Sequence, residues 1–209
     1  MKVITSSGSV DPISLGSVES LRRCALGCRN CPLWEHATQT VFGDGCQHAR
    51  VMLVGEQPGS QEDIAGKPFV GPAGKLLHRA MMEAGLDESE TWITNAVKHF
   101  KWKPRGKVRL HQKPSAGEID ACRPWLLAEL QMIAPEVLVI MGATAARSLL
   151  GSGIKVTRDR GLLRQSSLAA KVILTVHPSS LLRRLPAPDP QDYERFVADL
   201  SLAKAVNAR

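Results

Sequence analysis

Three polar residues able to take part in chemistry each come at the end of a short apolar run. They are Glu56, Asn95 and His177. Apolar runs of about four to eight residues are typical of buried strands, and ligands of open parallel sheets bind beyond the carboxyl ends of the strands. We therefore expect this carboxylate, amide and imidazole to meet at one rim. Taken singly, each has an alternative as a loop acid, a strand cap or a hydrogen-bonded turn residue.

The elements that must position these residues alternate between strands and helices. Apolar runs predict strands over residues 50–55, 91–97, 136–141 and 171–176. Helical patterns predict helices over residues 74–85, from the capping-box sequence at Ser115 to about Ile133, after the third strand to near Gly151, and from about Asp189. Buried strands that alternate with helices imply a parallel sheet covered on both faces. We predict an α/β fold with one three-layer α/β/α domain over residues 1–209 and a four-stranded parallel sheet. It comprises a cysteine-bearing leader at 1–49 and a core at 50–206.

Positive charge is concentrated in one long connection. The formal net charge is +7, and seven basic residues with no acid among them lie between residues 98 and 113: Lys98, Lys101, Lys103, Arg105, Lys107, Arg109 and Lys113. A focused basic segment is the pattern expected of a surface that contacts phosphates. Phe100 and Trp102 lie among the charges, and exposed aromatic residues usually meet a partner surface. The alternative is a solvated loop that only keeps the protein soluble.

The cysteines suggest a metal or iron-sulfur site. Cys28 and Cys31 form a C-x-x-C sequence, with Cys24 one turn upstream. The chain shows no apolar stretch of secretory type and no run long enough to span a bilayer, so we expect a cytoplasmic protein with no membrane partner. A reducing compartment argues against a disulfide framework. The alternative is that these cysteines are small buried apolar residues.

Four motifs in order resemble family 4 of the uracil-DNA glycosylases. Gly55-Glu56-Gln57-Pro58-Gly59 resembles the family's Gly-Glu-x-Pro-Gly motif, and residues 62–74 resemble the stretch that follows it. Residues 94–98 resemble the strand with the uracil-reading asparagine, and residues 177–183 resemble the second motif. The resemblance runs from about Cys28 to Arg183. It implies a monomeric glycosylase that flips and excises uracil from DNA, both single-stranded and double-stranded.

Two features resemble the UdgX branch, whose members stay covalently attached to their product. One is Gln57, and the other is Lys-Val-Arg-Leu-His at residues 107–111, which resembles that branch's Lys-Arg-Arg-Ile-His insertion. Positions 108 and 110 differ from the pattern, but the terminal histidine, His111, is present. This resemblance implies that His111 replaces water as the nucleophile. The alternatives are a multiple-turnover glycosylase in which Glu56 orients water, and a non-catalytic iron-sulfur module that binds DNA.

The resemblance also implies roles for the remaining site residues. Phe69 would stack on the flipped base, Asn95 would read its edge, and His177 would stabilise the departing anion. The other substrate-binding positions are Gly55, Gln57, Pro58 and Gly59. The positions implied to contact DNA are Lys107, Arg109, Ser179, Ser180 and Arg183.

A 4Fe-4S cluster is a further implication of the resemblance. Cys28, Cys31 and Cys122 match three of the family's four cysteine ligands, and the fourth position falls at His99. Histidine can ligate iron in such clusters, so we expect these four residues to hold it and to brace the leader and the basic segment against the sheet. Cys24 or Cys46 is the alternative fourth ligand, with His99 then an ordinary loop histidine.

Overall fold

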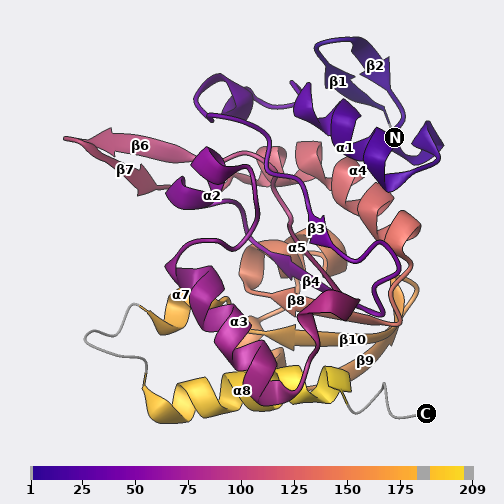
Figure 1. Cartoon of the computed structure of the whole chain (residues 1–209). Coiled ribbons are helices and arrows are strands. Elements are labelled where there is room, and N and C mark those ends of the chain that lie inside the picture. Colours follow the sequence, from indigo (N-terminus) through magenta and orange to yellow (C-terminus); the bar gives the residue numbers. More distant parts are fainter. Residues whose placement is uncertain (1, 183–188, 205–209) are drawn as a thin grey trace.

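A mixed sheet of six strands lies at the centre of the computed structural model, which describes residues 2–182 and 189–204 (Figure 1). Its order is β3-β5-β4-β8-β10-β9. The four inner strands run parallel: β5 (Thr91–Asn95), β4 (Val51–Gly55), β8 (Val137–Met141) and β10 (Ala169–Thr175). The edge strands β3 (Asp44–Gly45) and β9 (Leu163–Ser166) are antiparallel. The predicted parallel sheet of four strands is confirmed, and two short edge strands extend it.

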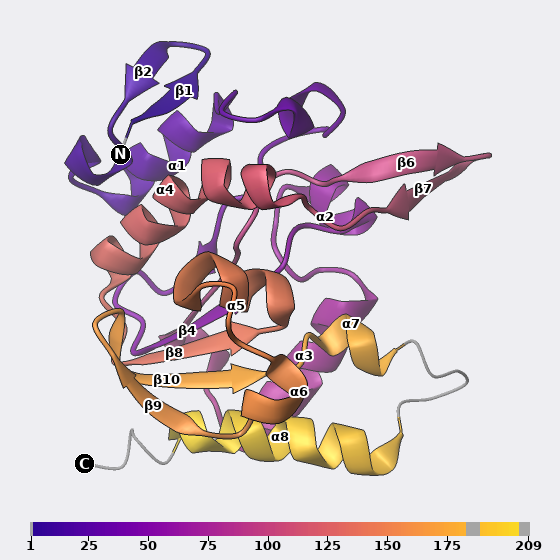
Figure 2. The ribbon, with the colours of Figure 1, turned by 180° about the vertical axis from the view of Figure 1, so that it is seen from behind.

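Helices cover both faces of this sheet, which is why β4, β5 and β8 are buried along their whole length. One face packs against α4 (Ala116–Ile133) and α5 (Ala143–Leu150), and α1 (Val18–Leu26) packs on α4. The opposite face packs against α3 (Pro72–Ala84), α7 (Pro178–Leu181) and α8 (Pro190–Lys204) (Figure 2). The predicted α/β/α layering is therefore confirmed.

Helix α4 begins where its capping box predicts. Ser115 N donates to Glu118 Oε2 at 2.6 Å, and Glu118 N donates to Ser115 Oγ at 3.3 Å. This reciprocal pair satisfies two backbone donors that a helix start leaves open. The helix ends at Ile133, as predicted. Its buried face carries Cys122 and Glu129 toward the sheet.

Several small elements complete the described chain. They are the hairpin β1 (Val3–Thr5) and β2 (Gly8–Val10), the 3-10 turns η1 (Pro12–Leu15), η2 (Pro32–Glu35) and η3 (Glu88–Glu90), and the short helices α2 (Ser60–Ala65) and α6 (Val156–Asp159). Within the described ranges, no helix combines the length and the apolar character needed to cross a membrane.

The basic segment forms a β-hairpin where the sequence analysis expects an irregular loop. Strand β6 (Trp102–Arg105) pairs antiparallel with β7 (Val108–His111), and Gly106 in the turn has a φ of 58°. A positive φ at a two-residue hairpin turn matches the twist of the flanking strands and favours glycine. The hairpin projects from the body (Figures 1 and 2). Trp102 pairs with His111 at the end of the hairpin farthest from the turn.

Candidate active site

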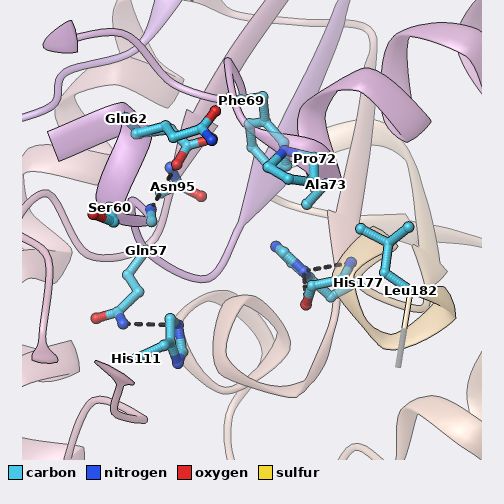
Figure 3. A pocket seen from close by; sticks show the side chains of 13 residues that line it. Gln57, Ser60, Glu62, Phe69, Pro72, Ala73, Asn95, His111, His177 and Leu182 are labelled. Atoms are coloured by element: carbon cyan, nitrogen blue, oxygen red, sulfur yellow. Dashed lines mark hydrogen bonds between the residues drawn. The ribbon is translucent and has the colours of Figure 1, made fainter. Parts of the chain in front are cut away.

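A cavity of about 530 Å³ opens where the inner strands end. Its wall includes Gln57 after β4, Asn95 at the end of β5, His177 after β10, Phe69 before α3 and His111 at the end of β7 (Figure 3). Segments far apart in the sequence therefore bring most of the predicted substrate-binding and catalytic side chains to one place. Gly59 and Ser179 also line this cavity. Gly55, Glu56 and Pro58 lie next to its wall in sequence but are not part of it.

Asn95 presents a buried acceptor at this cavity. The residue is 2% exposed, and its Oδ1 has no hydrogen-bond partner among the residues that the structure describes. Gly55 pairs with Asn95 across the parallel strands and makes room for it: a Cβ at residue 55 would lie 2.5 Å from both Asn95 Oδ1 and the Phe69 ring. Leaving a buried acceptor unpaired costs about 1–3 kcal/mol. An N–H group of a ligand would remove that cost.

Phe69 forms a second wall of the cavity and is held in an unusual conformation. Its φ is 55°, in the left-handed region that residues with a side chain rarely adopt, at a cost on the order of 1–3 kcal/mol. Gly74 permits this conformation, because the Phe69 carbonyl occupies the space where a Cβ at residue 74 would lie. The ring centroid lies 5.9 Å from that of His177. The aromatic face is thus fixed before any ligand arrives.

Glu62 is a cavity residue that the sequence analysis does not identify. Its carboxylate accepts hydrogen bonds from Gly59 N at 3.0 Å and from Gly71 N at 2.7 Å, and the residue is buried. It therefore ties the turn after β4 to the segment that follows Phe69. The sequence carries a signal for it, since an acid three residues after the N-cap of a helix is the second half of a capping box.

His177 has one ring nitrogen committed to its own chain. Ser179 N donates to His177 Nδ1 at 3.2 Å, and Ser179 Oγ lies 2.8 Å from the same nitrogen. A nitrogen that accepts a backbone N–H carries no proton, so the neutral ring carries its proton on Nε2. Ser180 is exposed and donates through Oγ to the His177 carbonyl at 2.7 Å. Arg183 lies outside the described residues.

His111 lies between two residues of the first motif. Its Nε2 is 2.8 Å from Gln57 Nε2 (Figure 3). The same nitrogen is 3.4 Å from Glu56 Oε1. The other oxygen of Glu56 accepts a hydrogen bond from Thr144 Oγ1 at the start of α5. The His111 side chain is 46% exposed at the cavity mouth. This arrangement places an oriented carboxylate within reach of an accessible imidazole.

Gln57 holds the hairpin that carries His111. Lys101 N donates to Gln57 Oε1 at 3.1 Å, and Gln57 Nε2 donates to the Gln112 carbonyl at 3.0 Å. Lys101 precedes β6 and Gln112 follows β7, so these two contacts hold both sides of the hairpin base. Gln57 is buried, so its amide bonds the hairpin rather than solvent. These bonds fix the hairpin base and, with it, the position of His111.

The phosphate-contact surface expected for the basic segment is smaller than its sequence suggests. Lys98 is fully buried, so it cannot meet a phosphate, and Phe100 is buried rather than exposed. Lys101 pairs with Glu118. The exposed basic side chains of the hairpin are Lys103, Arg105 and Lys107.

Arg109, which the resemblance assigns to DNA, has a structural partner here. Its guanidinium pairs with the buried Asp63 at 2.5 Å and bonds Ser60 in α2. It also lies over the rings of Phe100 and Trp102. These contacts anchor the hairpin to α2, and a phosphate contact by Arg109 stays a prediction.

The four residues expected to hold a cluster lie on three segments that meet beside α4. No group of three or more His, Cys, Asp and Glu side chains in the described ranges is arranged to hold a metal ion. The donors still fit a cluster in kind: Cys28, Cys31 and Cys122 are near enough to interact electrostatically, and Cys28 and His99 line one cavity of about 200 Å³. Burial lowers the pKa of His99 to about 4 and raises the pKa of Cys122. His99 Nε2 lies 2.9 Å from Thr40 Oγ1.

Comparisons with known proteins identify relatives over most of the chain. The uracil DNA glycosylase superfamily profile matches residues 42–201. The Type-4 uracil-DNA glycosylase of Thermotoga maritima is 39% identical over 75% of this chain and 78% of its own length. That of Archaeoglobus fulgidus is 32% identical over 88% of this chain and 89% of its own length. A matching profile over the six-stranded sheet, the cavity and most of α8 places this chain in the uracil-DNA glycosylase superfamily.

Proposed function

We propose that this protein excises uracil from DNA and stays bound to the abasic site through His111. The observation that supports excision is the buried Asn95 Oδ1, which faces a cavity walled by Phe69 and His177 without a partner among the described residues. Uracil carries a proton on N3, whereas cytosine has a lone pair there. An accepting oxygen at this position would bind uracil and repel cytosine. The two relatives described above are named uracil-DNA glycosylases, and this name agrees with uracil as the substrate.

Excision then follows from the groups around the cavity. The base must leave the stack before its glycosidic bond can be reached. Phe69 would stack on the flipped base. As the N1–C1′ bond breaks, both electrons leave with uracil, and the Nε2–H of His177 would donate to uracil O2 and stabilise the anion. The sugar is left with an electron-poor C1′.

His111 would capture that carbon. The Nδ1 lone pair of the neutral imidazole forms the new bond to C1′, and the proton on Nε2, the nitrogen that faces Glu56, passes to that carboxylate. Glu56 Oε1 is 3.4 Å from the ring, and Thr144 holds the other Glu56 oxygen. Loss of this proton leaves a neutral adduct whose reversal would expel imidazolate, a poor leaving group. The adduct would therefore persist.

Glu56 also supports a second candidate, a conventional glycosylase with many turnovers. The same oriented carboxylate would direct a water to C1′ if His111 moved aside, and the Type-4 names of the relatives fit this reading equally. The two candidates differ in their product. Only the first leaves protein joined to the DNA strand.

Exposed and partly exposed residues supply the DNA surface in this proposal. Lys103, Arg105 and Lys107 on the hairpin and Ser179 and Ser180 on α7 would contact the backbone of single-stranded or double-stranded DNA. Such contacts set affinity and orientation, whereas the cavity sets the choice of base.

A 4Fe-4S cluster on Cys28, Cys31, His99 and Cys122 belongs to the same proposal. Thiolates and one imidazole are donors that such clusters accept. The three segments that carry these residues are the leader, the start of the basic segment and α4. The cluster would brace them and take no part in the chemistry at C1′.

Release of free uracil tests the excision step. An oligonucleotide with one uracil is incubated with the protein, and the free base is measured by mass spectrometry. We expect release from uracil-containing but not from cytosine-only DNA, and Asn95→Ala should slow it about 10- to 100-fold through the lost hydrogen bond. A protein that binds DNA but releases no uracil would instead be a binding module.

A further inference from the structure

A fully buried ion pair lies directly behind Asn95. The side chains of Lys98 and Glu129 are both 0% exposed, and Lys98 Nζ contacts Glu129 Oε2. Lys98 Nζ also donates to the Asn95 carbonyl at 2.8 Å and to Thr94 Oγ1 at 2.7 Å. The three protons of the ammonium group therefore each have an acceptor.

Glu129 completes the network from α4. Its Oε1 accepts from Gly43 N at 2.9 Å, and Thr94 Oγ1 lies 3.0 Å from its Oε2. Gly43 permits this approach, since a Cβ there would overlap Glu129 Oε1. A buried polar network with every member satisfied is rigid and specifies a single arrangement.

Stability alone does not explain this pair. Replacing a buried ion pair by apolar side chains of similar size is often neutral, or stabilising by about 1–4 kcal/mol. Lys98 does, however, hold a group that matters to the site: the carbonyl of Asn95, the last residue of β5. Fixing this carbonyl restrains the peptide plane that follows the Asn95 Cα, the atom from which the side chain projects.

We propose that Lys98 is a positioning residue for base recognition, with Glu129 as the group that neutralises and holds it. Lys98 fixes the Asn95 backbone so that Oδ1 points at the N3–H of uracil. Without this contact the amide turns, and the site loses rate on uracil and discrimination against cytosine. The inference rests on the proposed function, because it specifies how that function's recognition residue is aimed.

The test removes the network without leaving a buried charge. Lys98→Met alone would strand the Glu129 carboxylate, so the variant is the double change Lys98→Met with Glu129→Leu. We expect it to fold, with a lower thermal midpoint because Gly43 N loses its acceptor, and to keep the wild-type Kd for uracil-free DNA. Its rate constant for uracil release under single-turnover conditions should fall about 10- to 100-fold, the usual effect of a small misplacement. The matched control is Arg50→Met with Glu136→Leu. These residues form an ion pair just before β4 and β8, at the edge of the sheet away from the cavity, so the change should leave the rate unchanged.

A double-mutant cycle separates positioning from a general structural role. In the Asn95→Ala background the same double change should cost nothing further, because there is no amide left to aim. A loss of equal size in both backgrounds would overturn the inference. If the double variant does not fold, the isosteric Thr94→Val, which removes one acceptor of Lys98, takes its place in the same cycle.

A second readout keeps this inference distinct from the proposed function. A wild-type protein that releases no uracil refutes the proposed function. The orientation of the Asn95 amide is then followed by the side-chain amide resonances of ¹⁵N-labelled protein. These should move in the network variant and stay in place in the Arg50 and Glu136 control. Resonances that stay in place in both would overturn the positioning role.

Discussion

Asn95 presents a hydrogen-bond acceptor to the cavity, and His177 presents a donor. Asn95 offers an accepting Oδ1, and the Ser179 contact leaves His177 with its proton on Nε2. Uracil carries a donor at N3 next to an acceptor at O2, so this pair of groups matches its edge. At the scale of single residues, recognition therefore depends on protonation and pairing as much as on residue type.

Thr144 should control how quickly the adduct forms. Its hydroxyl donates to Glu56 Oε2, so Thr144→Val would free the carboxylate to rotate away from His111. We expect adduct formation to slow about 10-fold, in line with the loss of one hydrogen bond to a charged group. Glu56→Gln should slow it further, because an amide cannot accept the ring proton. Single-turnover gel kinetics measure both, and equal rates in wild type and Thr144→Val would refute the link.

His99 gives the sharpest test of the cluster. His99→Cys would restore four thiolate donors and should retain iron and inorganic sulfide, while His99→Ala should lose them from anaerobically purified protein. Broad absorbance near ~400 nm and the iron-to-sulfide ratio report the result. Retention of both elements in His99→Ala would transfer the fourth position to another residue, with Cys24 or Cys46 as the next candidates.

The sequence predicts a site residue when that residue lies at the end of a strand. It does not predict a residue whose role depends on a partner far away in the sequence. Asn95 and His177 reach the cavity because each follows a strand, as the pattern of apolar runs predicts. In the sequence, Lys98 looks like one more basic residue of the segment. Its partner Glu129 lies on α4, and no neighbouring residue indicates that the two form a pair.

At the scale of elements, the hairpin of β6 and β7 decides where His111 lies. Gln57 fixes its base, and Arg109 fixes one strand to α2 through Asp63. Basic residues occupy every second position from Lys103 to Arg109, and such a run of charge is also what a solvated loop would show. The single glycine between two short segments is the hairpin signal that was available.

The exposed basic residues of the hairpin should set the salt dependence of DNA binding. Arg105→Gln with Lys107→Gln should weaken binding and lower the slope of log K against log salt by about 0.7–0.9 per lost phosphate contact. The control is Lys101→Gln, whose amine already pairs with Glu118 and should contribute little. The same slope in all three proteins would show that the hairpin tip does not meet phosphates.

At the scale of the molecule, two apolar cores on opposite faces of the sheet explain why the layering was predictable. Strands buried on both faces are apolar along their whole length, and this pattern survives in the sequence of β4 and β8. The edge strands leave no such mark, because β3 has only two residues and β9 pairs irregularly with β10. The rim that results is where the cavity opens.

We expect the protein to act as a monomer. Helices cover both faces of the sheet, and the exposed large apolar side chains, among them Ile4, Met82 and Val108, belong to different elements. Light scattering should give the mass of one 22.7 kDa chain, and one chain per uracil in complex with DNA. A concentration-dependent increase toward twice this mass would contradict the expectation.

A denaturing gel of the protein after reaction with uracil-containing DNA tests most directly whether His111 captures the sugar. The wild type should leave a band of joined protein and DNA that survives boiling in detergent, with one equivalent of uracil released. His111→Ala retains Asn95 and His177, and its vacated space admits water, so it should release uracil and leave no joined band. A joined band in His111→Ala, or none in the wild type while uracil is released, would contradict the central claim that His111 captures the sugar.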